Sequence, residues 1–190
     1  MPERVLILDR DGVINEDSDA YIKSPDEWTP LPGSIEAIAR LSHAGFRIAV
    51  ATNQSGIGRG LFSLSDLNAM HRRLRNLVAA QGGRIEMIAF CPHRPAENCP
   101  CRKPKAGLLE EIARRMNIDL TAVPVVGDSL SDLIAARLVG AAPWLVMTGK
   151  GRRTLASIEK NVHDGVLRDV PVCQDLFAVA NRLIRNQGRP

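Results

Sequence analysis

Carboxylates stand close together near the start of the chain. Asp9 and Asp11 are separated by one residue, and Gly12 follows them directly. In an extended chain, residues two apart project from the same face, and the glycine permits a tight turn that keeps both side chains in one place. One carboxylate of such a pair can attack an electrophile while the other moves protons. We therefore predict that Asp9 and Asp11 carry chemistry and do not merely cap a loop.

Two like charges this close need a cation or a shared proton. Mg²⁺ prefers oxygen ligands and keeps several waters, so it meets that need. A third carboxylate, Asp128, follows Gly127 much later in the chain. We predict a magnesium site formed by Asp9, Asp11 and Asp128.

Polar and basic residues elsewhere could bind an anion. Thr52 offers a hydroxyl, Asn53 offers an amide, and Lys103 stands in the sequence Cys-Arg-Lys-Pro-Lys. A lysine beside a phosphoryl group offsets the charge that develops in the transition state. Each signal is weak alone, because Thr-Asn-Gln is an ordinary turn composition and a basic run is most often a solvated surface. The interpretation of these residues as an anion-binding site therefore depends on the carboxylates described above.

Three of the four cysteines fall within one short loop, with the spacing Cys-x-His-x5-Cys-x-Cys. The members are Cys91, His93, Cys99 and Cys101. Three thiolates and one imidazole suit a closed, tetrahedral structural Zn²⁺ site; the alternative is a set of reduced surface cysteines beside an unrelated histidine. The loop is rich in proline and poor in apolar residues, so a metal would organise it and position the Arg102 and Lys103 that follow. Cys173 is expected in the core instead.

Short runs rich in valine, isoleucine and leucine predict the strands that must position these residues. The runs cover residues 5–8, 47–51, 85–90, 123–126 and 144–147. Their continuous apolar character is typical of strands buried on both faces. Helical patterns separate them: two begin near Ser34 and Ser65 as possible caps, and two cover residues 108–116 and 133–139. Alternating strands and helices predict an α/β fold with a single doubly wound, mostly parallel sheet.

In such sheets ligands bind beyond the carboxyl ends of the strands. The first predicted strand leads into residues 9–12, the second into 52–56 and the fourth into 127–129, with Asp132 one helical turn further. We expect these three segments to meet at one edge of the sheet. The intervals between the predicted elements leave no room for a large cap domain.

Length and composition limit the remaining possibilities. The 190 residues are 45% apolar and 24% charged, which predicts one globular domain over residues 1–190. A net charge of +4 is too small to indicate a nucleic-acid partner, and no apolar run reaches the roughly 18 residues of a membrane helix. The first residues contain no apolar signal segment, so we expect a cytoplasmic monomer that acts on a small molecule.

The order of these motifs along the chain is Asp-x-Asp-Gly, Thr, Lys and Gly-Asp-x-x-x-Asp. In this order, residues 4–150 resemble the haloacid dehalogenase superfamily of phosphotransferases. The resemblance implies a Rossmann-like fold and an aspartyl-phosphate intermediate. The implied roles are nucleophile for Asp9, general acid and base for Asp11, phosphoryl binding for Thr52 and Lys103, Mg²⁺ binding for Asp128, and support of that site for Asp132.

Three motifs narrow the resemblance. The chain is similar to the D-glycero-D-manno-heptose 1,7-bisphosphate 7-phosphatases in these motifs. They are the segments 9–15 and 52–60, and Cys-Pro-His followed by Cys-Arg-Lys-Pro at 101–104. That family removes the C7 phosphate in the synthesis of ADP- or GDP-heptose for bacterial surface polysaccharide such as lipopolysaccharide. The resemblance implies substrate contacts from Asp17, Thr52, Asn53, Gln54, Ser55, Arg59, Arg102 and Lys103.

Two departures leave alternatives open. Ser129 stands where that family carries lysine, and the segment 17–21 differs from its Asp-His-Gly-Tyr. The zinc motif is shared with the histidinol-phosphate phosphatases, while Arg59 could meet a second phosphate that histidinol phosphate lacks. A second phosphate would need cations away from the metal, for which Arg59, Arg102 and Lys105 are candidates. A non-catalytic, zinc-organised phosphate-binding module is the other alternative, and the anomer at C1 is left open.

Overall fold

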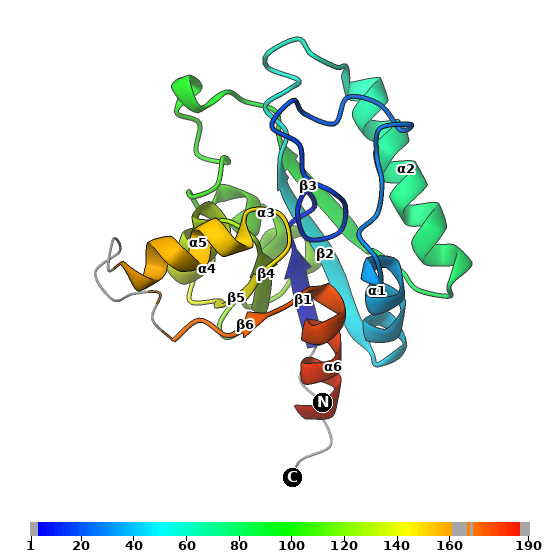
Figure 1. The fold of residues 1–190 in the computed structure, drawn as a ribbon, viewed down its shortest axis with the longest axis vertical. Helices are drawn as coiled ribbons and strands as arrows, with labels where there is room; N and C mark the ends of the chain where they lie inside the picture. Colours follow the sequence, from blue (N-terminus) through cyan, green and yellow to red (C-terminus); the bar gives the residue numbers. More distant parts are fainter. Residues whose placement is uncertain (1–3, 161–166, 168, 187–190) are drawn as a thin grey trace.

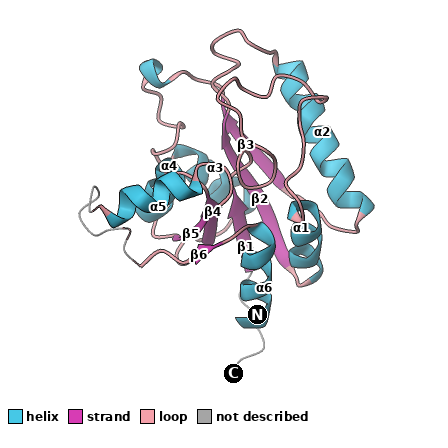
Figure 2. Cartoon of the chain, in the orientation of Figure 1, coloured by secondary structure: helices cyan, strands magenta, loops and turns pink. Residues whose placement is uncertain are grey.

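The computed structural model describes residues 4–160, 167 and 169–186, and within them six strands form one parallel sheet. The strand order is β3-β2-β1-β4-β5-β6, and every neighbouring pair is parallel (Figure 2). The strands are β1 (Arg4–Leu8), β2 (Phe46–Asn53), β3 (Met87–Cys91), β4 (Pro124–Gly127), β5 (Ala142–Val146) and β6 (Val172–Cys173). The doubly wound sheet predicted from the sequence is confirmed.

Helices cover both faces of the sheet (Figure 1). On one face lie α1 (Ser34–His43), α2 (Leu64–Ala80) and α6 (Leu176–Asn186), and on the other α3 (Gly107–Met116), α4 (Leu130–Leu138) and α5 (Gly151–Glu159). A short 3-10 helix, Pro95–Glu97, lies in the cysteine loop. None of the helices in the described residues is long and apolar enough to cross a bilayer.

The central strand explains why this sheet is buried on both sides. Leu6 and Leu8 of β1 pack into the core beneath α1, α2 and α6, whereas Val5 and Ile7 pack into the core beneath α3 and α4. Successive side chains of a strand point to opposite faces, so an unbroken apolar run fills two cores at once. The strand pairing continues one residue further, where the Asp9 N–H donates to the Val126 carbonyl at 2.8 Å. This bond fixes the first carboxylate at the end of β1.

Both predicted helix caps were wrong. α2 begins after Ser63, whose hydroxyl accepts from the Asp66 N–H while the Asp66 carboxylate accepts from the Ser63 N–H. This reciprocal pair satisfies two donors at once, and Asp66 adds a negative charge at the helix N-terminus that Asn68, three residues after Ser65, would not supply. α1 follows Gly33, and Ser34 is its first residue; the Ser34 hydroxyl donates instead to the Ile14 carbonyl at 2.6 Å.

No residue range was predicted for β6, α5 or α6. β6 contains only two residues, and α5 follows Lys150 within a basic run that carries few apolar residues. Cys173, expected in the core, lies in β6 and is partly buried against the core under α6. The absence of a large cap domain is confirmed within the described residues, since only a loop joins β1 to α1 and only α2 stands between β2 and β3.

Candidate active site

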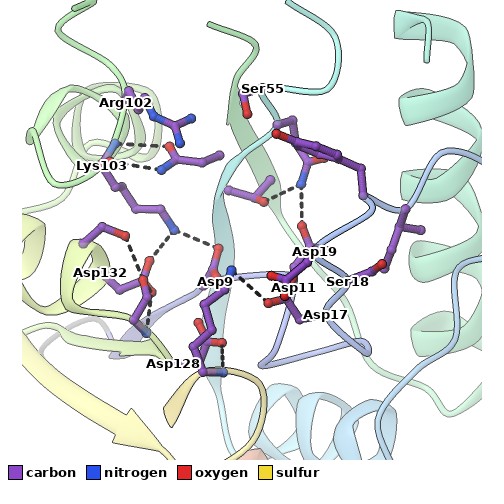
Figure 3. A pocket seen from close by; sticks show the side chains of 18 residues that line it. Asp9, Asp11, Asp17, Ser18, Asp19, Ser55, Arg102, Lys103, Asp128 and Asp132 are labelled. Carbon is purple, nitrogen blue, oxygen red and sulfur yellow. Dashed lines mark hydrogen bonds and ion pairs between the residues drawn. The ribbon is translucent and has the colours of Figure 1, made fainter. Parts of the chain in front are cut away.

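A cavity of about 370 Å³ opens at the carboxyl ends of the central strands (Figure 3). β1 lies between β2 and β4, the point where the strand order reverses direction and an open α/β sheet leaves a crevice. Among the predicted site residues, those that line the cavity are Asp9, Asp11, Asp17, Thr52, Asn53, Gln54, Ser55, Arg102, Lys103 and Asp128. The fold therefore gathers four separate segments of the chain around one space.

Lys103 lies between two carboxylates (Figure 3). Its Nζ is 2.8 Å from Asp9 Oδ1 and 2.5 Å from Asp132 Oδ1, and it donates to the Ala51 carbonyl at 2.6 Å. Burial alone would lower the pKa of this amine, but the two carboxylates outweigh it and raise the pKa above its usual range. Lys103 is therefore a fixed positive charge beside Asp9.

Asn53, the last residue of β2, holds Lys103 in place. Its Oδ1 accepts from the Lys103 N–H at 3.1 Å, and its Nδ2 donates to the Lys103 carbonyl at 3.1 Å. The sequence indicated that Asn53 would contact substrate directly. In the structure, both ends of its amide engage the backbone of Lys103, so its side chain joins β2 to the loop that carries the lysine.

Asp9, Asp128 and Asp132 form a group in which one carboxylate oxygen of each residue lies within 4.8 Å of the other two. Burial and the Asp132 carboxylate raise the pKa of Asp9 well above its usual range, and the same two causes raise the pKa of Asp128 to about 7. Buried carboxylate oxygens whose negative charge is not fully neutralised by nearby cations suit a hard divalent cation such as Mg²⁺. The donor set therefore fits the predicted magnesium.

Asp11 was predicted as a third magnesium ligand, but its carboxylate is not in that group. It accepts hydrogen bonds from Arg10 at 2.9 to 3.1 Å, from Asn15 at 2.8 Å and from Gln54 at 2.7 Å. Burial would raise the pKa of Asp11, but the charge of Arg10 and these hydrogen bonds outweigh burial and lower it. Gln54 also donates to the Thr52 hydroxyl at 2.8 Å, so it links the second carboxylate to the threonine.

Two glycines pack directly on Asp128. A Cβ on Gly12 would come within 2.1 Å of Asp128 Oδ2, and a Cβ on Gly149 would come within 2.2 Å of the same atom. Both glycines also have positive φ. The Lys150 N–H donates to Asp128 Oδ2 at 2.7 Å, and the Thr154 hydroxyl donates to the Asp128 carbonyl at 2.8 Å. The chain after β5 thus fixes the carboxylate that follows β4.

The cysteine loop gathers its four predicted ligands. The sulfur–sulfur distances among Cys91, Cys99 and Cys101 are 3.2, 3.4 and 3.5 Å, and His93 Nδ1 lies 3.3 and 3.5 Å from two of the sulfurs. Ligands of a tetrahedral Zn²⁺ at about 2.0 to 2.3 Å lie about 3.5 to 3.8 Å apart. The cysteines form no disulfide. The donor set fits a structural zinc, and its members lie slightly closer together than tetrahedral ligands of a bound ion would. The Arg102 guanidinium donates to the His93 carbonyl at 3.3 Å.

Known proteins are similar to this chain in sequence and fold. A family model described as HAD-hydrolase-like matches residues 100–173. The chain is 56% identical over 185 residues to the D-glycero-beta-D-manno-heptose-1,7-bisphosphate 7-phosphatase of Pseudomonas aeruginosa, covering 97% of this chain and 100% of that protein. It is 52% identical over 182 residues to the protein of the same name from Bordetella bronchiseptica, covering 96% and 98%.

The chain belongs to the heptose 1,7-bisphosphate 7-phosphatase family. A crystal structure of the D,D-heptose 1,7-bisphosphate phosphatase from B. bronchiseptica, complexed with magnesium and phosphate, matches the fold with a TM-score of 0.90 and 52% identity. The match covers 96% of this chain and 99% of that one. The resemblance drawn from the motifs is confirmed at the level of the family.

Ser129 has a structural task in this member of the heptose bisphosphate phosphatase family. Its N–H and its hydroxyl both donate to Asp132 Oδ2, at 3.1 and 2.6 Å, at the start of α4. The other oxygen of Asp132 pairs with Lys103. The residue that departs from the family pattern therefore orients the carboxylate that holds the lysine.

Of the three cations predicted to meet a second phosphate, Arg102 lines the cavity, and Arg59 and Lys105 do not. The Arg59 guanidinium lies over the Tyr21 ring at 6.0 Å, and Arg59 itself does not line the cavity. Lys105 donates to Asn98 and does not line it either. Lys150 lines it instead, with its Nζ 2.9 Å from Asp17 Oδ2. The rule that ligands lie beyond strand ends could have found Lys150, because it follows the predicted strand at 144–147 closely.

Proposed function

We propose that this chain is a Mg²⁺-dependent phosphatase that removes the C7 phosphate of D-glycero-β-D-manno-heptose 1,7-bisphosphate. The observation that carries the proposal is the cavity in which the Asp9 carboxylate is paired with the buried Lys103 and adjoins Asp128. The family supports the substrate, and the names of its relatives support the β anomer. The proposed physiological setting is the synthesis of nucleotide-activated heptose for surface polysaccharide.

In the first step an oxygen of Asp9 attacks the C7 phosphorus. The new bond between Asp9 and phosphorus forms as the bond between phosphorus and the C7 oxygen breaks, and Asp11 gives its proton to that oxygen. Asp11 is held ionised in the free protein. The negative charge of the arriving phosphate raises its proton affinity, so Asp11 takes up this proton as substrate binds.

In the second step water attacks the phosphorus of the aspartyl phosphate. Asp11 accepts a proton from the water, the bond between Asp9 and phosphorus breaks, and inorganic phosphate leaves. Lys103 and the Thr52 hydroxyl bind the phosphoryl oxygens in both steps, and the fixed charge of Lys103 stabilises the negative charge that develops there. Asp9 and Asp128 would hold Mg²⁺, which when bound would supply positive charge that stabilises the transferring phosphoryl group.

The second phosphate would bind away from the metal. Arg102 and Lys150 line the cavity together with Lys103. Arg102 donates to the His93 carbonyl and Lys150 pairs with Asp17, and a bound phosphate could accept from either cation in addition to or instead of these partners. Histidinol phosphate lacks a second phosphate and would leave these cations without a ligand. This charge distribution favours a bisphosphate over the histidinol-phosphate alternative.

We further propose that residues 1–190 act as one catalytic domain and as a monomer. Zn²⁺ in the cysteine loop serves structure, because its four protein donors leave no open position. Phosphorylated sugars are charged and do not cross bilayers unaided, so the enzyme must work in the compartment where its substrate is made, which we propose is the cytoplasm.

Phosphate release from a substrate panel tests the proposal. The panel contains both anomers of heptose 1,7-bisphosphate, histidinol phosphate and common sugar phosphates, with Mg²⁺ present. We expect kcat/KM for the β-bisphosphate to exceed the others by about 100-fold, which corresponds to about 2.7 kcal/mol. A preference for histidinol phosphate would contradict the proposed substrate. Activity of Asp9→Asn equal to the parent would contradict the covalent mechanism and favour the non-catalytic alternative.

A further inference from the structure

Arg10 is a buried cation with no role in the proposed chemistry. Its side chain is about 1% exposed, and its Nε and Nη2 donate to both oxygens of Asp11. A buried guanidinium has five N–H donors, and leaving them unpaired costs free energy. Asp11 satisfies the donors on one side of the guanidinium. The Nη1 group on the other side needs an acceptor of its own.

His71 of α2 supplies that acceptor. Its Nε2 lies 3.4 Å from Arg10 Nη1, and its ring is buried with the Phe90 ring 6.2 Å away. Since arginine can only donate, Nε2 must be the unprotonated nitrogen in this contact. Burial and the charge of Arg10 lower the pKa of His71 to about 3, so the ring is neutral at physiological pH.

The place of His71 on its helix argues against simple packing. The other buried residues of α2 are Leu67, Met70, Leu74 and Val78, and His71 is the exception on this apolar face. A leucine would fill the same space with no polar atom to bury. What the imidazole adds is an acceptor aimed at Arg10, and Arg10 in turn contacts the carboxylate that moves protons.

We propose that His71 and Arg10 are positioning residues for Asp11. His71 holds the guanidinium in one orientation, and the guanidinium holds Asp11 facing the cavity beside Gln54 and Asn15. This inference rests on the proposed function, because it assigns the pair to the step in which Asp11 protonates the leaving oxygen. Neither His71 nor Arg10 touches substrate.

The test compares two leaving groups. A sugar oxygen must be protonated as it leaves, whereas p-nitrophenolate leaves readily without a proton. The variants are His71→Leu, which removes the acceptor, and His71→Gln, whose side-chain oxygen restores one. Met70→Leu is the matched control, because it changes the same buried face of α2 and keeps His71. The quantity measured is kcat/KM, which reports the steps up to release of the alcohol and leaves out hydrolysis of the aspartyl phosphate.

We expect His71→Leu to lose about tenfold or more in kcat/KM for the heptose bisphosphate, which is part of the roughly 100- to 10,000-fold that acid catalysis contributes, and less than about twofold for p-nitrophenyl phosphate. His71→Gln should recover most of the loss, and Met70→Leu should match the parent with both substrates. Equal losses with both leaving groups, or no loss with either, would overturn the proposal.

A second measurement is independent of activity. Nitrogen-15 NMR of histidine-labelled protein distinguishes the ring tautomers of the four histidines. We expect His71 to carry no proton on Nε2, and a protonated Nε2 would overturn the contact with Arg10. If the parent cleaves a different alkyl phosphate, the proposed substrate fails, but the ratio between that ester and p-nitrophenyl phosphate still tests His71.

Discussion

The ammonium of Lys103 lies 2.8 Å from Oδ1 of Asp9, although 94 residues separate them along the chain. Asp9 is fixed by the end of β1, and Lys103 is held through its backbone by Asn53 and through its ammonium by Asp132. The pair therefore depends on three elements that pack around the same strand end. Substitutions at each support should affect the site in different ways.

Lys103→Ala should remove the positive charge that lies beside the group formed by Asp9, Asp128 and Asp132. We expect kcat to fall by about 100-fold or more, as for loss of a donor that stabilises a developing oxyanion. Loss of one partner of a buried ion pair also destabilises the fold, by about 3 to 5 kcal/mol. Steady-state kinetics and urea unfolding measure the two effects. The control is Arg114→Ala, an exposed cation on α3 whose loss should change neither.

Gly12→Ala should displace Asp128, because a Cβ there meets its Oδ2 at 2.1 Å. Gly45 is the matched control: its φ of 85° resembles the 81° of Gly12, but a Cβ on Gly45 meets nothing within 4 Å. Both alanines should cost about 1 to 2 kcal/mol for the left-handed backbone. Only Gly12→Ala should weaken activation by Mg²⁺ in a titration of kcat. Equal magnesium dependence in the two variants would contradict the close packing.

Asp128 makes stability depend on pH when Mg²⁺ is omitted. Folding raises the pKa of Asp128 from 3.8 to about 7, so between these values the native state binds more protons than the unfolded state. The contribution of Asp128 to the free energy of unfolding therefore falls as pH rises from about 4 to 7, by at most about 4 kcal/mol.

Urea unfolding of the parent and of Asp128→Asn at several pH values checks this expectation. The lowered pKa of His71 makes its contribution to the free energy of unfolding rise with pH, opposite to that of Asp128. The informative quantity is therefore the difference in the free energy of unfolding between the parent and Asp128→Asn at each pH. The variant should gain stability relative to the parent as pH rises to 7, and added Mg²⁺ should stabilise the parent alone. A constant difference across this range would show that Asp128 is ionised throughout.

Replacement of Cys99 and Cys101 by serine should release the metal of the cysteine loop. We expect elemental analysis to find about one zinc per chain in the parent and none in the variant. Because Cys101 lies two residues before Lys103, kcat should fall as the loop loosens. Cys173→Ser is the control, since this cysteine lies in β6, away from the loop. A parent purified without chelator that contains no zinc would end the zinc hypothesis.

Lys150→Ala should weaken binding of a bisphosphate more than binding of a monophosphate. We expect KM for the heptose 1,7-bisphosphate to rise by about tenfold, as for loss of one charged hydrogen bond, while KM for the 7-monophosphate changes little. Lys160→Ala is an exposed control just beyond α5. If both substrates were affected equally, Lys150 would act through the Asp128 contact of its backbone and not through a second phosphate.

Local patterns determined much of this protein. The continuous apolar runs predicted five of the six strands of the described sheet, because a strand buried on both faces leaves no choice of polar residue. The grouping of Cys91, His93, Cys99 and Cys101 was predictable because all four lie within a short stretch at and after the end of β3, where close spacing keeps side chains near one another. The order of the motifs at successive strand ends then identified the family.

Partners far apart in the sequence were decided only by the tertiary structure. The motif spacing predicted Asp11 as a metal ligand, but it could not show that His71 of α2 contacts Arg10 or that Arg10 donates to both oxygens of Asp11. Nor could it show that the Asp132 carboxylate lies in one group with those of Asp9 and Asp128. Lys150 enters the cavity because the chain after β5 packs glycine against Asp128. The spacing of residues shows which strand end carries a side chain, whereas its hydrogen-bond partner depends on which neighbouring elements pack around that end.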